Sequence, residues 1–450
     1  MNRIIKYLTF LTIFTLFVSC SFDSKTGIWS GSEKEKKRVS KLEKDQENTA
    51  EIIKIYSSSD VYAKEISVTK SISLTEPKKN LSWEMSNLNL QNFIGNVYLS
   101  GVNNNFLKKK IGKNKFSISK LISSPVILND NIIFADDTGT IFNINQRGKK
   151  RWKKNIYKKF YKRIYKSLTF TIHKNKIYVA DNIGFVYAIN LQNGKLIWIK
   201  NQRVPLRSNI KIYDDKIFLI NQDNRIFCLD PDTGSIIWDA RSISTFIKSQ
   251  SFLGMAISKG GDLITLTSSG DLVKIKSKTG QFYWSLNTTG TILASENDFF
   301  QSSDIVIDDE NIIFSTTSSV SSYNINSGYL NWIKNIGSTN TPIIDGSHVF
   351  VISDNGYFVN LDKNSGEIIW STNILKILKK KKQKTKITGF VMGSKKIYVT
   401  TLNGYLLICS ASLGNVEDFK KIGNTITASP VISNGSLYIL TENSKIYGFR

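Results

Sequence analysis

One repeated pattern constrains the fold of this chain more than any other feature, and its clearest copy covers Asn335–Thr372. This copy holds a short apolar run after Pro342, an alternating stretch over His348–Ile352, a turn at Gly356 and two further alternating stretches separated by a second turn. Alternation with a period of two, bounded by turn residues, indicates β-strands. One copy therefore predicts a meander of four antiparallel strands.

The same punctuation recurs at intervals of roughly forty to fifty residues. A turn glycine stands four residues before a tryptophan at Gly148/Trp152, Gly194/Trp198, Gly234/Trp238, Gly280/Trp284, Gly328/Trp332 and Gly366/Trp370. An earlier turn residue, usually glycine, stands nine or ten residues before the later turn, at Gly139, Gly184, Asn224, Gly270, Gly356 and Gly404. Such a period indicates a repeat architecture.

A single repeat cannot bury both faces of its sheet, so neighbouring repeats have to stack and the array has to close or be capped. Strands that are almost entirely apolar suit sheets enclosed between two neighbours. A radial propeller meets both requirements and leaves only short edges open. We therefore predict an all-β fold, an eight-bladed β-propeller of four-stranded antiparallel blades.

The eighth blade has to be shared between two distant segments. The chain ends at Thr427–Arg450 with only three strands, and Asn105–Gly112 matches the missing fourth strand, because its Ile-Gly pair is followed by a Ser-Pro strand as in other repeats. Asp418 replaces the tryptophan in the seventh repeat. The complete repeats are expected at Ile122–Ile156, Leu168–Lys200, Arg207–Ala240, Phe252–Leu286, Asp304–Ile336, Thr341–Ile374 and Ile387–Ile422.

The N-terminus has the pattern of a targeting segment. Arg3 and Lys6 precede an apolar run over Tyr7–Val18, and Cys20 follows. This resembles a bacterial lipoprotein signal over residues 1–19, with lipidation at Cys20; an ordinary signal peptide or a single membrane anchor is the alternative. The apolar run is short for a membrane span. Ser21, in place of an aspartate, implies sorting to the outer membrane.

Three further segments follow from composition. Residues 20–80 are polar and charged and are expected to form a tether, with an optional short helix around Val39–Ile53. Residues 81–104 do not fit the repeat and are expected to pack on the outside of the propeller. Residues 105–450 form the propeller itself.

The formal net charge is +25, mostly from lysines spread along the chain. Solubility and attraction to anionic surfaces explain this charge better than recognition of nucleic acid. The two densest basic stretches are Lys149–Arg163 and Lys379–Lys384. We interpret them as solvated loops, with contact to lipid phosphates or acidic partner surfaces as the alternative.

No catalytic constellation is found. The glycines lie in expected hairpin turns, so none leads into a phosphate-binding helix, and His173 and His348, the only histidines, are expected at strand edges. Cys228 and Cys409 fall on opposite sides of the ring, beyond the roughly 7 Å between Cα atoms that a disulfide allows. We expect free buried thiols, no metal and no cofactor.

The tryptophan-bearing repeat resembles the bacterial pyrroloquinoline-quinone-like propeller repeat over Asn105–Arg450. Quinone-dependent periplasmic dehydrogenases use this repeat but carry adjacent cysteines, which this sequence lacks. The chain resembles more closely the B-subunit lipoprotein family of the outer-membrane β-barrel assembly machinery, in its alphaproteobacterial form. The resemblance rests on the lipoprotein signal, the polar tether, the extra segment before the first strand, the eight blades and the sequence NIGSTNTPIIDG at Asn335–Gly346.

This resemblance implies a non-catalytic scaffold, anchored by lipid to the outer membrane and facing the periplasm. It implies binding to the POTRA domains of the central barrel subunit, assistance to outer-membrane protein insertion, and contact with unfolded clients. By motif, Ile247 and Lys248 stand where the family has a leucine-arginine pair, and Asp298 lies near the family's acidic loop residues. Both loops depart from the family pattern, since Lys248-Ser249 replaces an Arg-Gly step and the acidic loop has gained residues.

Overall fold

The computed structural model describes residues 33–52, 62–68, 72–113, 115–116, 123–241, 252–289, 300–379 and 384–450. The predicted signal segment and Cys20 lie outside these ranges. Within the predicted tether, the helix α2 (Glu33–Ile52) begins six residues before the helix suggested by the sequence, and Ile66 pairs with Ser371 of the ring. No helix in the described part of the chain is long and apolar enough to cross a membrane.

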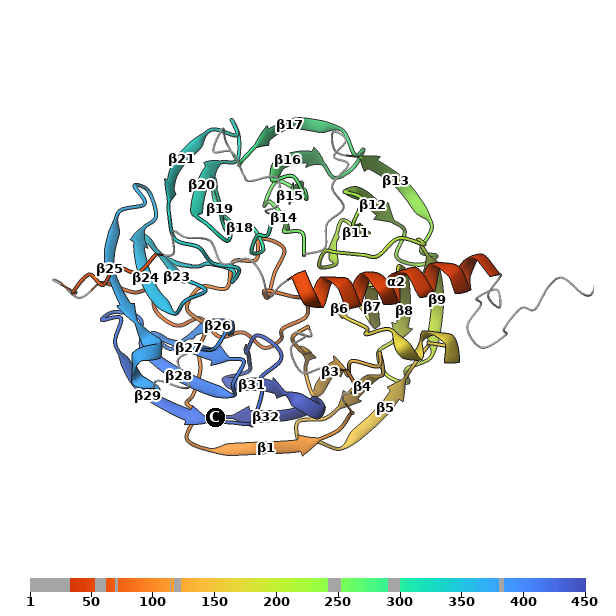
Figure 1. The fold of residues 1–450 in the computed structure, drawn as a ribbon, viewed down its shortest axis with the longest axis horizontal. Coiled ribbons are helices and arrows are strands. Elements are labelled where there is room, and N and C mark those ends of the chain that lie inside the picture. The colour runs from red at the N-terminus through yellow and green to blue at the C-terminus, as the bar shows by residue number, and fades with distance from the viewer. Residues whose placement is uncertain are drawn as a thin grey trace, which may run out of the picture.

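Eight four-stranded antiparallel sheets surround a central axis, as the sequence predicts (Figure 1). In seven blades the strands follow chain order from the axis outward, and the eighth takes its outermost strand from the start of the ring. Blades 1 to 4 are β2 (Val126–Leu128), β3 (Asn131–Ala135), β4 (Ile141–Ile144), β5 (Lys150–Lys154); β6 (Leu168–His173), β7 (Lys176–Asp181), β8 (Phe185–Asn190), β9 (Leu196–Asn201); β10 (Lys211–Tyr213), β11 (Lys216–Ile220), β12 (Arg225–Leu229), β13 (Ile236–Arg241); and β14 (Met255–Ile257), β15 (Asp262–Leu266), β16 (Asp271–Lys276), β17 (Phe282–Asn287).

The other four blades follow the same order. They are β18 (Val306–Asp308), β19 (Asn311–Ser315), β20 (Val320–Asn324), β21 (Leu330–Lys334); β22 (Ile343–Asp345), β23 (His348–Ile352), β24 (Tyr357–Asp362), β25 (Ile368–Asn373); β26 (Ile387–Gly393), β27 (Lys396–Thr401), β28 (Tyr405–Ser410), β29 (Val416–Lys421); and β30 (Val431–Ser433), β31 (Ser436–Thr441), β32 (Lys445–Phe449), β1 (Asn105–Lys110). Three short 3-10 helices lie in connections, namely η1 (Lys159–Arg163), η2 (Ile374–Ile377) and η3 (Glu442–Ser444).

The repeated tryptophans join each blade to the next one. A methyl group on Gly366 of blade 6 would lie 2.5 Å from the indole of Trp332 in blade 5, so the indole packs on a turn that has no Cβ. The same contact recurs in the pairs Trp152–Gly194, Trp198–Gly234, Trp238–Gly280, Trp284–Gly328 and Trp370–Gly414. Four of these indoles also donate a hydrogen bond of 2.8–3.0 Å into the next blade, to the carbonyls of Leu191, Pro231, Ser277 and Lys363.

A β-bulge precedes each of these tryptophans. In blade 6, Trp370 pairs with Asn360 and Ile368 pairs with Leu361, which leaves Ile369 as the extra residue. The third and fourth strands of all seven complete blades share this irregularity. Because a bulge bends the strand and re-aims its side chains, it turns the indole toward the neighbouring blade.

Ring closure uses the same contact with a different side chain. β1 pairs antiparallel with β32, from Asn105 opposite Phe449 to Lys110 opposite Lys445. Leu107 of β1 occupies the tryptophan position, and its Cδ1 lies 3.0 Å from where a Gly148 methyl would stand. Blade 8 has no hairpin between its last two strands, since β1 comes from a distant segment. A tryptophan at Asp418 of blade 7 would therefore have no turn glycine to contact.

The interior between blades is apolar, and both predicted free thiols lie in it. Cys228 and Cys409 are free and buried. Burial raises the pKa of Cys228 to about 12 and raises the pKa of Cys409 as well. Both side chains therefore act as small apolar core residues.

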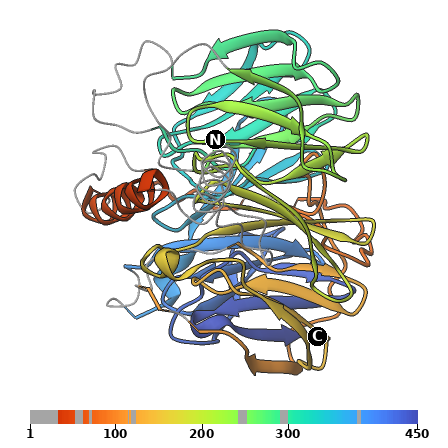
Figure 2. The same ribbon diagram turned by 90° about the vertical axis from the view of Figure 1, so that its right-hand side faces the viewer.

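Residues 72–104 cross the ring on the face opposite α2 (Figure 2), and the expectation that residues 81–104 pack on the outside is wrong. Trp83 is 3% exposed and pairs with Ile127 of β2. Farther along, the Leu90 carbonyl accepts a hydrogen bond of 2.9 Å from the N–H of Ile257 in β14. The segment lies here because the innermost strands have unpaired backbone groups with which it forms hydrogen bonds, and because its apolar side chains can pack into the interior.

The tryptophan–glycine contact predicts the effect of Gly366→Ala. Residue 366 has a φ of +69°, which is unfavourable for alanine, and the methyl group would overlap the Trp332 indole. We expect the free energy of unfolding to fall by about 2–4 kcal/mol in urea titrations. Gly260→Ala is the control, because its nearest neighbour would be 3.8 Å away; a change as large as that of Gly366→Ala would contradict the role of the contact.

Candidate functional site

Connections between strands form two different faces. The turns between second and third strands, and the crossings from each outermost strand to the next blade, lie on the face that carries α2, here called the α2 face. The turns between first and second strands lie on the opposite face, together with residues 72–104 (Figure 2). Loops held by a rigid scaffold commonly carry binding residues, which makes both faces candidates.

α2 is attached to blades 1 and 2 by one ion-paired cluster. Arg38 lies 2.7 Å from the Glu35 carboxylate and donates hydrogen bonds to the carbonyls of Ile183 at 2.6 Å and Arg203 at 3.2 Å. Tyr161 of η1 donates to Glu35 at 2.7 Å. Burial opposes ionisation of Glu35, but the hydrogen bonds from Arg38 and Tyr161 outweigh it and lower its pKa. The helix is thereby fixed in position on the ring.

Asp304 connects the central ends of several blades. Its buried carboxylate accepts hydrogen bonds from the Met255 N–H at 2.9 Å and from the amides of Asn209 at 2.7 Å and Asn87 at 2.8 Å. Met255 begins β14, Asn209 precedes β10 and Asn87 belongs to the crossing segment. Burial raises the pKa of Asp304, while nearby Lys211 and the three donors oppose the rise.

Lys211 fixes the crossing segment from the same region. Its ammonium group is fully buried and donates to the Asn89 carbonyl at 2.7 Å and to the side-chain oxygen of Asn92. Burial lowers the pKa of Lys211 to about 8. Asp304 and Lys211 thus hold blades 3, 4 and 5 in one arrangement with the segment that crosses the opposite face.

Beside this network lies a central cavity of about 260 Å³. Serine, threonine and asparagine side chains form most of its described lining, in which Asp304 is the one charged residue and Trp83 and Ile94 are apolar parts of the wall. Among these described lining residues, no serine or threonine is accompanied by a histidine or a second carboxylate. No three His, Cys, Asp or Glu side chains in the described ranges are grouped so that they could hold a metal ion.

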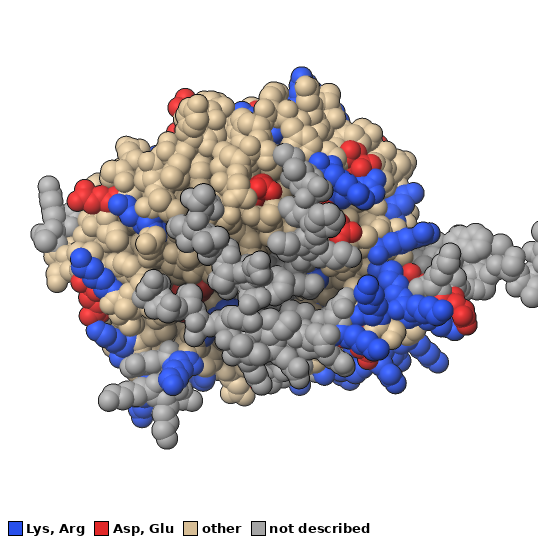
Figure 3. Space-filling view, turned by 45° about the horizontal axis from the view of Figure 1, so that its top comes forward, with Lys and Arg blue, Asp and Glu red and all other residues tan. Residues whose placement is uncertain are grey.

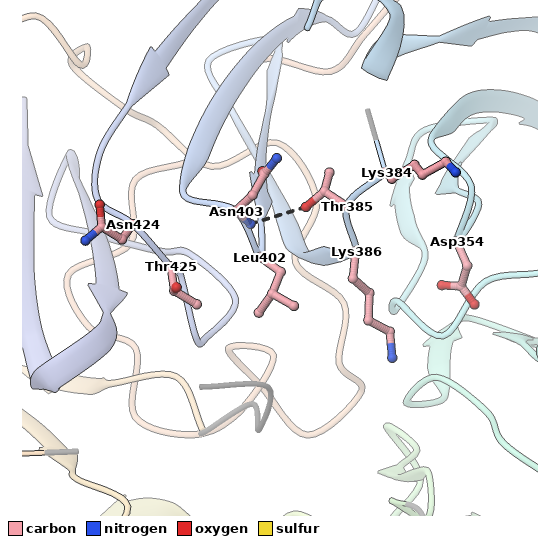
Figure 4. Close-up of a pocket in the computed structure, with 8 residues that line it drawn as sticks. All are labelled: Asp354, Lys384, Thr385, Lys386, Leu402, Asn403, Asn424 and Thr425. Carbon is pink, nitrogen blue, oxygen red and sulfur yellow. Dashed lines mark hydrogen bonds between the residues drawn. The ribbon is translucent and has the colours of Figure 1, made fainter. Parts of the chain in front are cut away.

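A wider depression of about 690 Å³ opens beside the loop into blade 7 (Figure 4). Lys384 and Lys386 come from that loop, and Asn403 donates a backbone hydrogen bond of 3.2 Å to Thr385. Asp354 lies at one side, where burial raises its pKa and Thr339 donates to it. The remaining lining residues are Leu402, Asn424 and Thr425. Its amines, amides and hydroxyls suit a polar protein surface more than a small substrate.

The sequence-predicted partner residues Ile247, Lys248 and Asp298, like Cys20, lie outside the described residues. The strand ends that flank their loops are described. Arg241 pairs with Arg225 beside the turn between the second and third strands of blade 3, and Asn287 pairs with Asp271 at the matching place in blade 4. The strand ends that precede residues 242–251 and 290–299 therefore lie at the α2 face, in neighbouring blades.

Sequence reasoning missed Asp304, Lys211 and the cluster that attaches α2. One signal was available in the repeat itself. Asp304 occupies the position that Asn209 has in blade 3, and each follows a serine whose hydroxyl accepts a backbone hydrogen bond from the second strand of its blade. The spacing of Glu35 and Arg38 on one helical face was another. Neither signal indicates which distant residues are contacted.

Comparison with known proteins agrees with this geometry. A family model described as outer membrane protein assembly factor BamB matches residues 137–372. This chain belongs to that family. Relatives include BamB of Yersinia pestis, 20% identical over 62% of this chain and 70% of its own length, and an uncharacterized protein of Rickettsia prowazekii, 24% identical over 73% and 83%. The Rickettsia relative fits the alphaproteobacterial type.

Solved structures share the fold. The crystal structure of BamB from Moraxella catarrhalis aligns with a TM-score of 0.60 at 15% identity, over 76% of this chain and all of that one. A europium-containing methanol dehydrogenase aligns with a TM-score of 0.61 at 10% identity, over 82% and 89%. At such identities the likeness concerns the propeller architecture alone.

The attachment of α2 predicts the effect of Arg38→Ala. This change removes the ion pair with Glu35 and both hydrogen bonds to blade 2. We expect amide exchange in residues 33–52 to become at least about tenfold faster, because a single helix that is not packed on the ring has only marginal stability in water. Hydrogen-exchange mass spectrometry measures this. Lys37→Ala, at an exposed neighbouring position, should leave the exchange unchanged, and equal effects of both variants would contradict the cluster's role.

Proposed function

We propose that this chain is a non-catalytic scaffold of outer-membrane protein assembly that binds the POTRA domains of the central barrel subunit through the α2 face. Membership in the BamB family supports the assembly role. The observation that supports this site is that Arg241 and Asn287, the strand ends before the segments that hold Ile247, Lys248 and Asp298, lie at the α2 face of neighbouring blades.

The residues that follow the two segments are joined by a hydrogen bond near the ring axis. Asp304 follows the second loop by a few residues and accepts the N–H of Met255, which follows the first loop. Phe252 and Phe300, the first described residues after each loop, lead into this junction. Because these flanking residues are held rigidly, less conformational entropy is lost when the loops bind a partner. Unfolded outer-membrane proteins are the further proposed clients.

The alternative is a quinone-dependent periplasmic dehydrogenase. A quinone with several carboxylates and its calcium ion would need basic groups and a set of oxygen ligands at the axis. The described lining does not fit these groups: among the described residues no lysine or arginine lines the central cavity, and the one carboxylate there, Asp304, accepts hydrogen bonds from three donors. Purified protein with a quinone absorbance band and dye-linked dehydrogenase activity would favour the alternative.

The partner assignment is tested by Lys248→Glu. Crosslinked pull-downs from cell envelopes should recover the barrel subunit with the wild-type chain, and the variant should bind purified POTRA domains about tenfold more weakly, because reversal of an interface charge creates repulsion. Lys278→Glu carries the same charge change at an exposed turn on the opposite face and should bind normally. Absence of the barrel subunit from wild-type pull-downs would refute the proposal. Ile247→Ala and Asp298→Lys extend the series.

Lipidation at Cys20 is proposed as the link to the outer membrane, with the propeller on the periplasmic side. Metabolic labelling with palmitate should mark the wild-type chain and leave Cys20→Ala unlabelled, because this thiol is the acyl acceptor. Cys409→Ala is the control and should be labelled normally, since Cys409 is buried. Label that persists in Cys20→Ala would sink this assignment.

A further inference from the structure

The outer wall of the ring has an uneven charge distribution. β1 and β5, the outermost strands of blades 8 and 1, carry seven cations in NFLKKK and KRWKK, and most of these are exposed. The five outermost strands of blades 2 to 6 together carry only Lys200, Arg241 and Lys334. Those five strands expose apolar side chains instead, including Ile197, Ile236, Ile237, Tyr283, Leu330 and Ile333.

The cations of β1 and β5 belong to one continuous surface. A Gly148 methyl, in the turn that leads into β5, would lie 3.3 Å from Cβ of Lys109 in β1, so no gap separates the two strands there. η1 continues the surface with exposed Lys159, Lys162 and Arg163. We call the exposed cations of β1, β5 and η1 the basic wall. α2, which contacts η1, adds exposed Lys36, Lys37, Lys41 and Lys44, and Figure 3 shows Lys and Arg side chains gathered at this side of the molecule.

Few of these charges are neutralised within the chain. In β1 and β5, Arg151 alone has a carboxylate partner among the described residues, Asp130 at 2.6 Å. The basic wall is also convex and formed mainly by lysines. A lysine carries a point charge on a flexible side chain, which suits a surface of many phosphates better than a partner that requires fixed hydrogen-bond geometry. Among the described residues of β1, β5 and η1, no large apolar side chain is exposed to serve as an anchor for a protein partner.

The length of chain before α2 adds a second argument. Thirteen residue steps separate Cys20 from Glu33, and they span at most about 45 Å even when fully extended. Because α2 is attached to the ring through Arg38, a lipid on Cys20 would keep this side of the ring near the bilayer.

We propose that the basic wall binds the anionic phospholipid surface of the bilayer to which the chain is anchored. This rests on the anchoring proposed above. Each lysine near an anionic bilayer adds a modest attraction, and several together produce stable contact that weakens with salt. Blades 8 and 1 lie opposite blades 4 and 5 in the ring, so bilayer contact leaves the proposed POTRA loops on the far side.

Vesicle co-sedimentation tests the proposal. The chain from Ser21 to Arg450, which keeps every described residue, is mixed with phosphatidylcholine vesicles that contain either no phosphatidylglycerol or about one third of it. We expect binding to the anionic vesicles alone, with loss as salt rises from about 50 to 300 mM. The wall variant K108E/K109E/K150E/K153E should bind at least about tenfold more weakly. Equal binding to both vesicle types would refute the proposal.

The control variant K195E/K200E/K276E/K278E lies on blades 2 and 4. Without Arg3 and Lys6 the tested chain carries +23 instead of the +25 of the full sequence, and four reversals lower this to +15 in the control and in the wall variant alike. It should keep its affinity within about threefold. Equal losses in both variants would overturn the proposal in favour of whole-chain charge. Loss of binding in about 10 mM inorganic phosphate would also overturn it, because single phosphates rather than a bilayer would then be the ligand.

POTRA binding measured in parallel separates this proposal from the previous one. The wall variant is expected to lose vesicle binding and keep POTRA binding, whereas Lys248→Glu should do the reverse. If the wall variant instead keeps vesicle binding and loses POTRA binding, the basic wall is a protein interface and the proposal is wrong. Thermal unfolding midpoints of all variants establish that they are folded.

Discussion

The packing of an indole on a glycine turn of the next blade is the contact on which the ring depends. Among the described residues adjacent blades share no strand pairing, so side-chain packing provides most of the contact between them. Trp332 can approach the turn at Gly366 closely because no Cβ intervenes, and its N–H also bonds to the Lys363 carbonyl. The bulge before each tryptophan directs the indole sideways. Repetition of one contact therefore sets both the spacing and the tilt of the blades.

Regular contacts produce a symmetric ring, and the non-repeated residues make it asymmetric. The segment over residues 72–104 fills one face of the ring, while α2 lies on the other. Asp304 and Lys211 are charged groups in an interior that otherwise holds few, and both are satisfied by amides and carbonyls of the crossing segment. Blades 3, 4 and 5 are consequently fixed relative to each other at their central ends. A surface supported in this way needs little ordering on binding.

The fold was predictable from sequence because its main contact has a sequence signature. The glycine-to-tryptophan offset, the Ile-Gly to Ser/Thr-Pro connection and the three-stranded C-terminus together predicted eight blades and the closing role of Asn105–Gly112, and β1 confirms this. The path of residues 81–104 was predicted wrongly, since their partners are inner strands more than forty residues away and in most cases more than a hundred. Asp304 could not be predicted because its role depends on its burial and on donors from distant segments, and both exist only in the folded ring. Ile247, Lys248 and Asp298 lie in loops that the repeat does not constrain.

The attachment of α2 to the ring limits the freedom of the N-terminal part of the chain. A flexible tether of sixty residues would reach roughly 40–45 Å on average and let the ring rotate freely. With Arg38 bound to blade 2 and Tyr161 bound to Glu35, the predicted tether is divided at α2. Under the proposed lipidation of Cys20, only the short part before α2 separates the lipid from the ring. The same side carries the basic wall. Two attachments on one side of a rigid ring restrict its rotation, which one attachment cannot do. In the proposed arrangement, blades 3 to 5 face away from the bilayer, on the side where the proposed POTRA contact would form.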